Sequence, residues 1–167
     1  MKNNLKSKLP STGTNIFTKI SSLANSYKAI NLSQGYPDFE VDTTLKKLVK
    51  KNLDLGFDQY APMQGVLKLR KAIAKKHHQL YGKYYDEADE ITITAGATQA
   101  IFTTITAFIS PGDEVIIFSP TYDCYEPAVE LNQGKTIFIE LDSPDFKIDW
   151  ETVEKKISTK TKMIIVN

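Results

Sequence analysis

The chain of 167 residues is 41% hydrophobic and 25% charged, which is typical of a folded globular domain and argues against disorder, collagen and coiled coil. Its 21 basic and 20 acidic residues leave a formal net charge of +1, so it lacks the basic excess of a dedicated nucleic-acid-binding protein. No apolar run approaches the roughly 20 residues of a membrane span, and the basic start lacks the apolar stretch of an export signal. The single cysteine, Cys124, excludes an internal disulfide and favours a reducing, cytoplasmic location.

Helix and strand signals alternate along the chain, after a start at residues 1–14 that we expect to be a mobile tail. Apolar residues at helical spacing predict helices over 15–27, between a cap at Asp42 and a stop at Gly56, over 66–81, over 98–109, up to about 132, and after a cap at Asp149. The helix over 98–109 is apolar nearly all round, which predicts that it is buried. Short apolar runs predict strands over 91–94, 114–118, 135–141 and 162–166.

This alternation indicates an α/β protein of the doubly wound class, in which helices cover a mostly parallel sheet. The chain stops one residue after the fourth predicted strand, with no covering helix to follow it. A buried parallel strand normally leads into a loop and a helix, so we expect the chain to be a truncated part of a longer polypeptide.

Ligands of open parallel sheets bind beyond the carboxyl ends of the strands, and two segments there are candidates. Residues 94–99 (TAGATQ) join a strand to a helix, and their small side chains leave backbone N–H groups open to an anion, although tight packing would demand the same residues. Tyr122 follows another strand, where its ring could stack on a planar cofactor or simply cap the core.

Other reactive residues indicate no separate site. His77 and His78 are adjacent on a helix, so their rings point apart and we expect no metal site. Cys124 has no histidine near it in sequence, which favours a buried thiol over a nucleophile. Arg70 is the one arginine, and its place beside the apolar face of a helix predicts a structural role.

Five motifs occur in order along the chain: NLSQGYPDF (31–39), QYAPMQG (59–65) followed by LRKAI (69–73), TAGATQA (94–100), PGDEV (111–115) and SPTYDCYEP (119–127). Together they resemble the motifs of the class I and II aminotransferases that use pyridoxal phosphate, with most similarity to the methionine and kynurenine aminotransferase branch. The resemblance covers residues 15–167. It implies the type I fold of pyridoxal-phosphate-dependent transferases, with 15–45 belonging to the small domain and substrate loop and 46–167 to an incomplete large, cofactor-binding domain.

The resemblance also implies roles for seven residues. Ala97, Thr98 and Gln99 would hold the cofactor phosphate, and Tyr122 would stack on its ring. Tyr60 would reach the phosphate of a partner subunit, which implies a homodimer with shared active sites. Gly35 and Tyr36 would contact the substrate.

The activity implied is the transfer of an amino group from a methionine-like, aromatic or kynurenine-like amino acid to a 2-oxo acid by a ping-pong mechanism. The Schiff-base lysine is expected beyond Asn167, so no catalytic residue is assigned within the chain. A carbon–sulfur β-lyase on the same scaffold, a non-catalytic fragment and an aminotransferase-like sensing domain are the alternatives.

Overall fold

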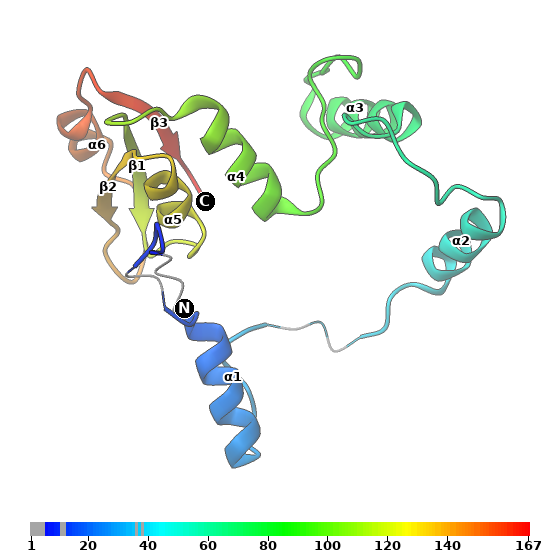
Figure 1. The fold of residues 1–167 in the computed structure, drawn as a ribbon, viewed down its shortest axis with the longest axis horizontal. Helices are drawn as coiled ribbons and strands as arrows, with labels where there is room; N and C mark the ends of the chain where they lie inside the picture. Colours follow the sequence, from blue (N-terminus) through cyan, green and yellow to red (C-terminus); the bar gives the residue numbers. More distant parts are fainter. Residues whose placement is uncertain (1–5, 11–12, 36, 38) are drawn as a thin grey trace, which may run out of the picture. The chain divides into compact units, whose positions relative to one another are not determined.

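The computed structural model describes residues 6–10, 13–35, 37 and 39–167. The contacts within it divide the chain into two compact units (Figure 1). One consists of Met1–Ile16 together with Ala95–Asn167, and the other of Phe17–Thr94.

The first unit is built on a three-stranded parallel sheet. Strands β1 (Glu114–Ser119), β2 (Lys135–Glu140) and β3 (Thr161–Ile165) lie in the order β2–β1–β3. In the register of the sheet, Ile116 of β1 lies opposite Ile137 of β2 and Ile164 of β3. Helices α4 (Ala97–Phe108), α5 (Tyr125–Leu131) and α6 (Trp150–Lys156) connect or flank the strands. The predicted α/β class with a parallel sheet is therefore confirmed.

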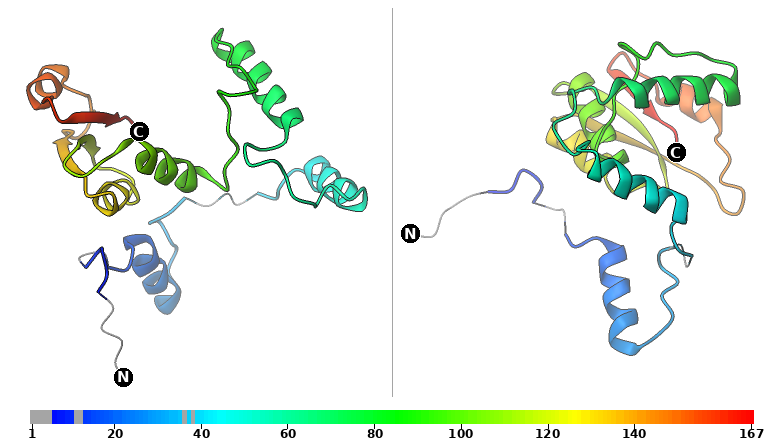
Figure 2. Two further views of the ribbon diagram at one scale, coloured as in Figure 1. Left: turned by 45° about the horizontal axis from the view of Figure 1, so that its top comes forward. Right: turned by 90° about the vertical axis from the view of Figure 1, so that its right-hand side faces the viewer.

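Apolar side chains fill both faces of this sheet, because successive residues of β1 point to opposite sides. One core holds Ile105, Ile109, Val115, Ile117, Tyr125, Ala128 and Val129, and the other holds Ile116, Phe118, Ile139 and Val153. Helix α5 thus belongs to one face and α6 to the other, as Figures 1 and 2 show. Burying an aliphatic or phenyl side chain stabilises a fold by about 1.5–3 kcal/mol, and β1 buries four in succession. This central strand therefore anchors the unit.

Helix α4 differs from the expectation of a buried helix. Within it only Ile105 is buried, whereas Phe102 and Phe108 are 43% and 62% exposed. The helix packs on the sheet and α5 through one side, and the described residues of its own unit do not cover its other side. An apolar composition predicts that a helix should be buried, but whether it is buried depends on neighbours that a local pattern does not contain.

The second unit contains three helices, α1 (Ile16–Tyr27), α2 (Thr43–Asp54) and α3 (Leu67–Tyr81). The predicted cap at Asp42 is confirmed: its carboxylate accepts hydrogen bonds from the backbone N–H groups of Thr44 at 2.7 Å and Leu45 at 3.2 Å. Gly82 follows α3 in a left-handed conformation, with φ of +71°, and ends the helix.

The predicted strand over 91–94 is wrong for the described structure, in which these residues form no strand. Within this segment, the Ile93 N–H donates a hydrogen bond to the Gln64 carbonyl, at 3.0 Å. Short β-branched runs favour extended backbone, but a strand also needs a partner strand in register.

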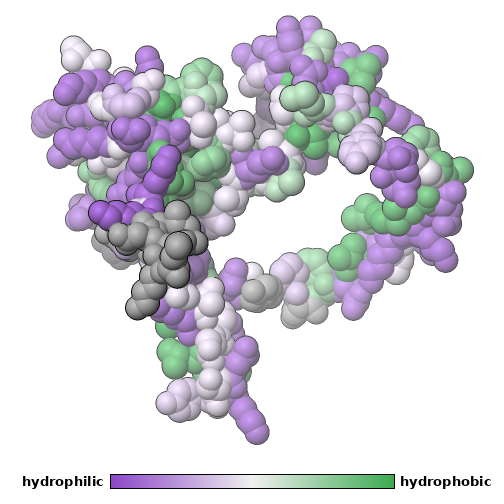
Figure 3. Space-filling model, in the orientation of Figure 1, coloured by the Kyte–Doolittle hydropathy of each residue, from purple (hydrophilic) through white to green (hydrophobic). Residues whose placement is uncertain are grey.

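Helix α2 is amphipathic and buries no residue within its unit. Its apolar residues Leu45, Leu48, Val49 and Leu53 are all about half exposed. Figure 3 shows hydrophobic residues along one side of this helix and hydrophilic ones along the other. Among the described residues, no helix is both long and apolar enough to cross a membrane.

Candidate functional site

The amino end of α4 offers backbone N–H groups to a ligand. Its cap is Gly96, which has φ of +95° and provides no side-chain hydrogen bond to the helix. Ala97, Thr98 and Gln99 follow as exposed residues, and no acidic residue lies in this first turn. Since the first N–H groups of a helix have no carbonyl one turn back, they carry partial positive charge that favours an anion. The predicted anion-binding character of this segment is thus consistent with its local structure.

The Gln99 side chain makes a hydrogen bond to the backbone within this turn. Its Oε1 accepts a hydrogen bond from the backbone N–H of Ala95 at 2.5 Å, just before the helix cap. This contact folds the glutamine back over the turn, one residue further than in a capping box, where the third helical residue bonds to the N–H of the cap itself. Gln99 therefore fixes the loop conformation in the structure, while its neighbours Ala97 and Thr98 are exposed residues of the first turn.

The direction of α4 brings this turn towards the carboxyl edge of the sheet. The helix ends at Phe108 and leads through a turn at residues 110–113 into the first residue of β1. Its carboxyl end therefore lies at the amino ends of the strands, and its amino end extends towards the opposite edge (Figures 1 and 2). That edge is where parallel α/β sheets bind their ligands.

Tyr122 lies at the same edge, in the loop that follows β1. Its side chain is 43% exposed, so part of the ring is open to a ligand. The ring meets the ring of Tyr125 edge to face, with 5.9 Å between centroids and an interplanar angle of 76°. Tyr125 is buried, and this burial raises the pKa of its phenol. Its hydroxyl donates a hydrogen bond to Oδ1 of Asn167 at 2.8 Å.

Two features of this edge were missed by sequence reasoning. Asn167 lies two residues after the end of β3, and its position after an apolar strand was the available signal. Thr121 has a buried Oγ1 without a hydrogen-bond partner in the described part of the chain, and such an atom is a group that a ligand or water would satisfy. The Asn15 side chain donates a hydrogen bond to the Asp123 carboxylate, in the loop beside Tyr122.

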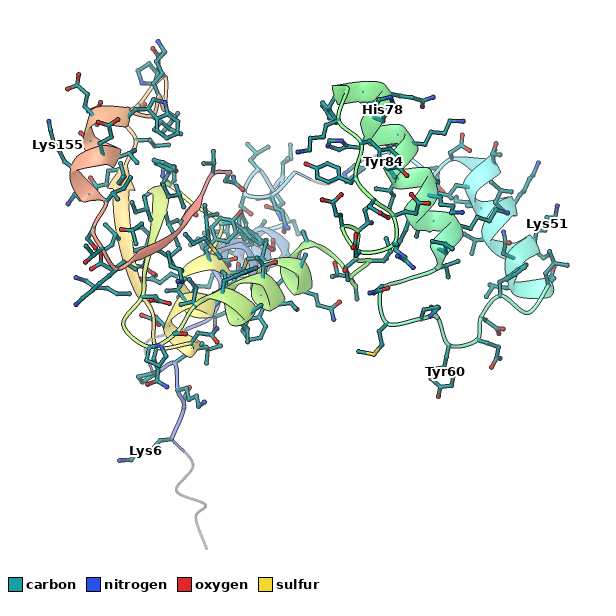
Figure 4. All side chains as sticks on the ribbon, turned by 90° about the horizontal axis from the view of Figure 1, so that it is seen from above. Lys6, Lys51, Tyr60, His78, Tyr84 and Lys155 are labelled. Atoms are coloured by element: carbon teal, nitrogen blue, oxygen red, sulfur yellow. The ribbon has the colours of Figure 1, made fainter. Side chains whose placement is uncertain are left out.

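The remaining predicted site residues belong to the second unit or lie outside the described residues. Gly35 is exposed, and a Cβ built on it would meet no atom within 4 Å. Tyr60 is fully exposed and projects from the loop between α2 and α3 (Figure 4). Tyr36 is outside the described residues. Because the units are defined separately, the proximity of Gly35 and Tyr60 to Tyr122 stays a prediction.

Arg70 is a buried structural residue, as its place on the helix predicted. It is 7% exposed and its guanidinium donates to three backbone carbonyls: Gly65 at 3.1 Å, Ala88 at 3.0 Å and Glu87. The guanidinium therefore ties the loop that carries Tyr60 to the segment after α3.

Among the described residues, the other titratable side chains form no separate site. Cys124 is partly buried, and burial raises the pKa of its thiol, which disfavours the reactive thiolate. His77 packs against the rings of Tyr81 and Tyr85. Within the described part of the chain, no cluster of three or more His, Cys, Asp or Glu side chains could hold a metal ion.

Comparison with known proteins gives consistent matches along the chain. Residues 27–167 match the family model described as aminotransferase class I and II. Methionine aminotransferase of Escherichia coli is 46% identical over 162 residues, which are 97% of this chain and 42% of the relative. Human kynurenine–oxoglutarate transaminase 3 is 36% identical over 165 residues, covering 92% of this chain and 36% of the relative.

Solved structures match equally well. A crystal structure from Escherichia coli with an identified methionine aminotransferase function has a TM-score of 0.92 at 46% identity, covering 96% of this chain and 42% of that one. The chain thus spans well under half the length of the relatives that it matches.

Proposed function

Because the chain belongs to the class I and II aminotransferase family, we propose that it serves an aminotransferase reaction, in which an amino group passes from an amino acid to a 2-oxo acid. The observation that carries this proposal is the match over residues 27–167 together with the open amino end of α4 at the carboxyl edge of the sheet. The names of the relatives support methionine-like and kynurenine-like amino acids as the substrate class. A two-step, ping-pong course and a cytoplasmic location are part of the same proposal.

The proposed cofactor is pyridoxal 5′-phosphate, which supplies an electron sink for the amino acid when it is bound. Three observations in the first unit fit this group. The first turn of α4 presents N–H groups and no acidic side chain to a phosphate dianion. Tyr122 offers a partly open ring to a pyridine ring. Thr121 holds a buried hydroxyl that lacks a partner in the described part of the chain, beside that ring.

Within this proposal the residues of the chain bind and orient. Ala97 and Thr98 hold the phosphate through their N–H groups, and Gln99 keeps the loop in the conformation that exposes them. Tyr122 would stack on the pyridine ring and so fix the orientation of the ring plane in the site. The proton-transferring lysine is not assigned to any residue of this chain.

The second unit is proposed to complete the site. Gly35 and Tyr36 would contact the substrate. The Tyr60 hydroxyl would donate a hydrogen bond to the phosphate in a partner subunit, and the full exposure of Tyr60 leaves it available for such a contact. A homodimer with shared sites follows, with residues 15–45 in the small domain and 46–167 in the large one.

Paired variants of Tyr122 test the cofactor proposal. The probe is pyridoxamine 5′-phosphate, titrated into the chain while the backbone amide signals of Ala97 and Thr98 are followed by NMR. An aromatic contact contributes about 0.5–1.5 kcal/mol beyond burial, so Tyr122→Ala is expected to weaken binding by up to roughly tenfold. Tyr122→Phe keeps the ring and is expected to bind nearly as tightly as the unaltered chain. Equal losses in the two variants would contradict ring stacking and favour a role for the hydroxyl.

Subunit mixing tests the role of Tyr60 in an assembled enzyme. Loss of one charge-assisted hydrogen bond by Tyr60→Phe is expected to cost about 1–2 kcal/mol of phosphate binding. Mixing Tyr60 variants with variants that lack the Schiff-base lysine is expected to restore part of the activity, because one site of each hybrid dimer keeps both groups. Exchange of subunits without any recovery would place Tyr60 in the site of its own subunit.

A further inference from the structure

Tyr125 contacts two other residues at the carboxyl edge of the sheet. Its ring lies against the ring of Tyr122, which follows β1, with 5.9 Å between centroids. Its hydroxyl donates to Oδ1 of Asn167, which follows β3, at 2.8 Å. The two strands are neighbours in the sheet, so one side chain links the loops that leave adjacent strands.

The environment of Tyr125 makes it a rigid support. It is 6% exposed and belongs to the apolar core that contains Ile105, Val129 and β1 residues. A side chain packed on this many sides has one available orientation, whereas Tyr122 is 43% exposed and would otherwise be free to rotate.

The hydrogen bond to Asn167 also has a directional consequence. A carboxamide has one acceptor oxygen and an NH₂ group with two donors. When the Tyr125 hydroxyl donates to Oδ1, that oxygen is held, and the NH₂ group of Asn167 remains available to an acceptor at the edge of the sheet. A phenylalanine at position 125 would fill the core equally well but would leave the carboxamide free to turn.

We propose that Tyr125 is a positioning residue that holds the Tyr122 ring and the Asn167 carboxamide in fixed orientations for the ring end of the cofactor. This inference rests on the proposed stacking role of Tyr122. The amino end of α4, which we assign to the phosphate, receives no contact from the Tyr125 hydroxyl. Tyr125 therefore acts on the ring part of the ligand and not on its phosphate.

Two probes separate this role from a merely structural one. Pyridoxamine 5′-phosphate carries both ring and phosphate, whereas inorganic phosphate carries only the anion. Each is titrated into the 167-residue chain and its Tyr125→Phe and Asn167→Ala variants, with amide NMR signals of Ala97 and Thr98 as the readout. Tyr84→Phe is the matched control, because it also removes a hydroxyl that donates to a side chain, that of Glu87, but in the second unit.

We expect Tyr125→Phe to weaken binding of pyridoxamine 5′-phosphate about three- to tenfold and to change the dissociation constant of inorganic phosphate by less than twofold. Asn167→Ala is expected to weaken binding of pyridoxamine 5′-phosphate at least as much, because it removes the NH₂ group as well as the shared contact, and the double variant is expected to add little to Asn167→Ala. Tyr84→Phe is expected to change neither constant. Equal weakening of both probes would overturn the proposal in favour of a structural role, and unchanged binding of both would overturn it as well.

A direct readout keeps the inference testable apart from the proposed function. The side-chain NH₂ signals of Asn167 are expected to shift and to exchange faster with solvent in Tyr125→Phe. If the unaltered chain binds neither probe, the proposed cofactor site fails, and these signals alone decide whether Tyr125 holds Asn167. Asn167 signals that stay unchanged in Tyr125→Phe would overturn the inference whether or not the probes bind.

Discussion

Replacing Arg70 by lysine is expected to loosen the second unit locally. The guanidinium is 7% exposed and donates to the carbonyls of Gly65, Glu87 and Ala88. A lysine ammonium is a single point donor and can keep about one of these contacts. Each lost hydrogen bond from a charged donor costs about 1–2 kcal/mol, so the loss of two is expected to cost about 2–4 kcal/mol.

Amide hydrogen exchange measures this loss where it occurs. The N–H of Gly65 donates to the Pro62 carbonyl at 2.7 Å, and that of Ile93 to the Gln64 carbonyl at 3.0 Å. If these bonds open together with the arginine contacts, 2–4 kcal/mol corresponds to exchange that is roughly 30- to 1,000-fold faster. Lys75→Met, an exposed change on the same helix, is the control. The reasoning is refuted if Arg70→Lys and Lys75→Met leave exchange at Gly65 and Ile93 equally protected.

Three further changes follow from single contacts. Gly65 has φ of +92°, and a Cβ there would lie 2.3 Å from a side-chain carbon, so Gly65→Ala is expected to lower the free energy of unfolding in urea by about 2–4 kcal/mol. Gly56→Ala is the control and should lower it less, because Gly56 has φ of +77° but open space around it. Equal losses in the two variants would mean that the clash at Gly65 relaxes. A hydrogen bond from Thr152 lowers the pKa of Asp149, so the carboxylate stabilises α6 above its unfolded pKa and this stabilisation is lost below about pH 4. Circular dichroism of the unaltered chain should therefore show a loss of helix in acid that is absent from Asp149→Asn. The same loss in Asp149→Asn would mean that another group causes it. Burial raises the pKa of the Cys124 thiol, so its alkylation at pH 7 should be slower than that of a free thiol and should become faster as the pH rises. Rapid labelling at pH 7 would contradict the partial burial of this thiol.

Local chemistry explains which elements could be predicted from the sequence. Asp42 and Asp149 begin helices because their carboxylates accept hydrogen bonds from backbone N–H groups a few residues ahead, and those groups are present in any context. Gly82 ends a helix because it adopts a left-handed conformation at little cost. In contrast, residues 91–94 have strand composition but no paired strand in the described structure, and pairing depends on segments far away in sequence.

The candidate site likewise has features that could be predicted from the sequence and features that could not. The open turn at Ala97 and Thr98 could be predicted because a helix start and its missing hydrogen bonds are local features. The contact between Tyr125 and Asn167 spans 42 residues and depends on β1 and β3 being neighbours, which no periodicity in the sequence indicates. The acceptors of Arg70 are backbone carbonyls, which every residue carries, so the sequence could suggest burial but not its partners.

The strand order β2–β1–β3 has a consequence for synthesis of the chain. The central strand, Glu114–Ser119, precedes both of its partners in sequence and leaves the ribosome before either of them. Its four successive buried residues therefore stay without their final cover until Thr161–Ile165 has been made. An apolar, β-prone segment that waits in this way is a target for chaperones and a risk for misassembly, so a strand that is deeply buried in the folded unit is exposed during production.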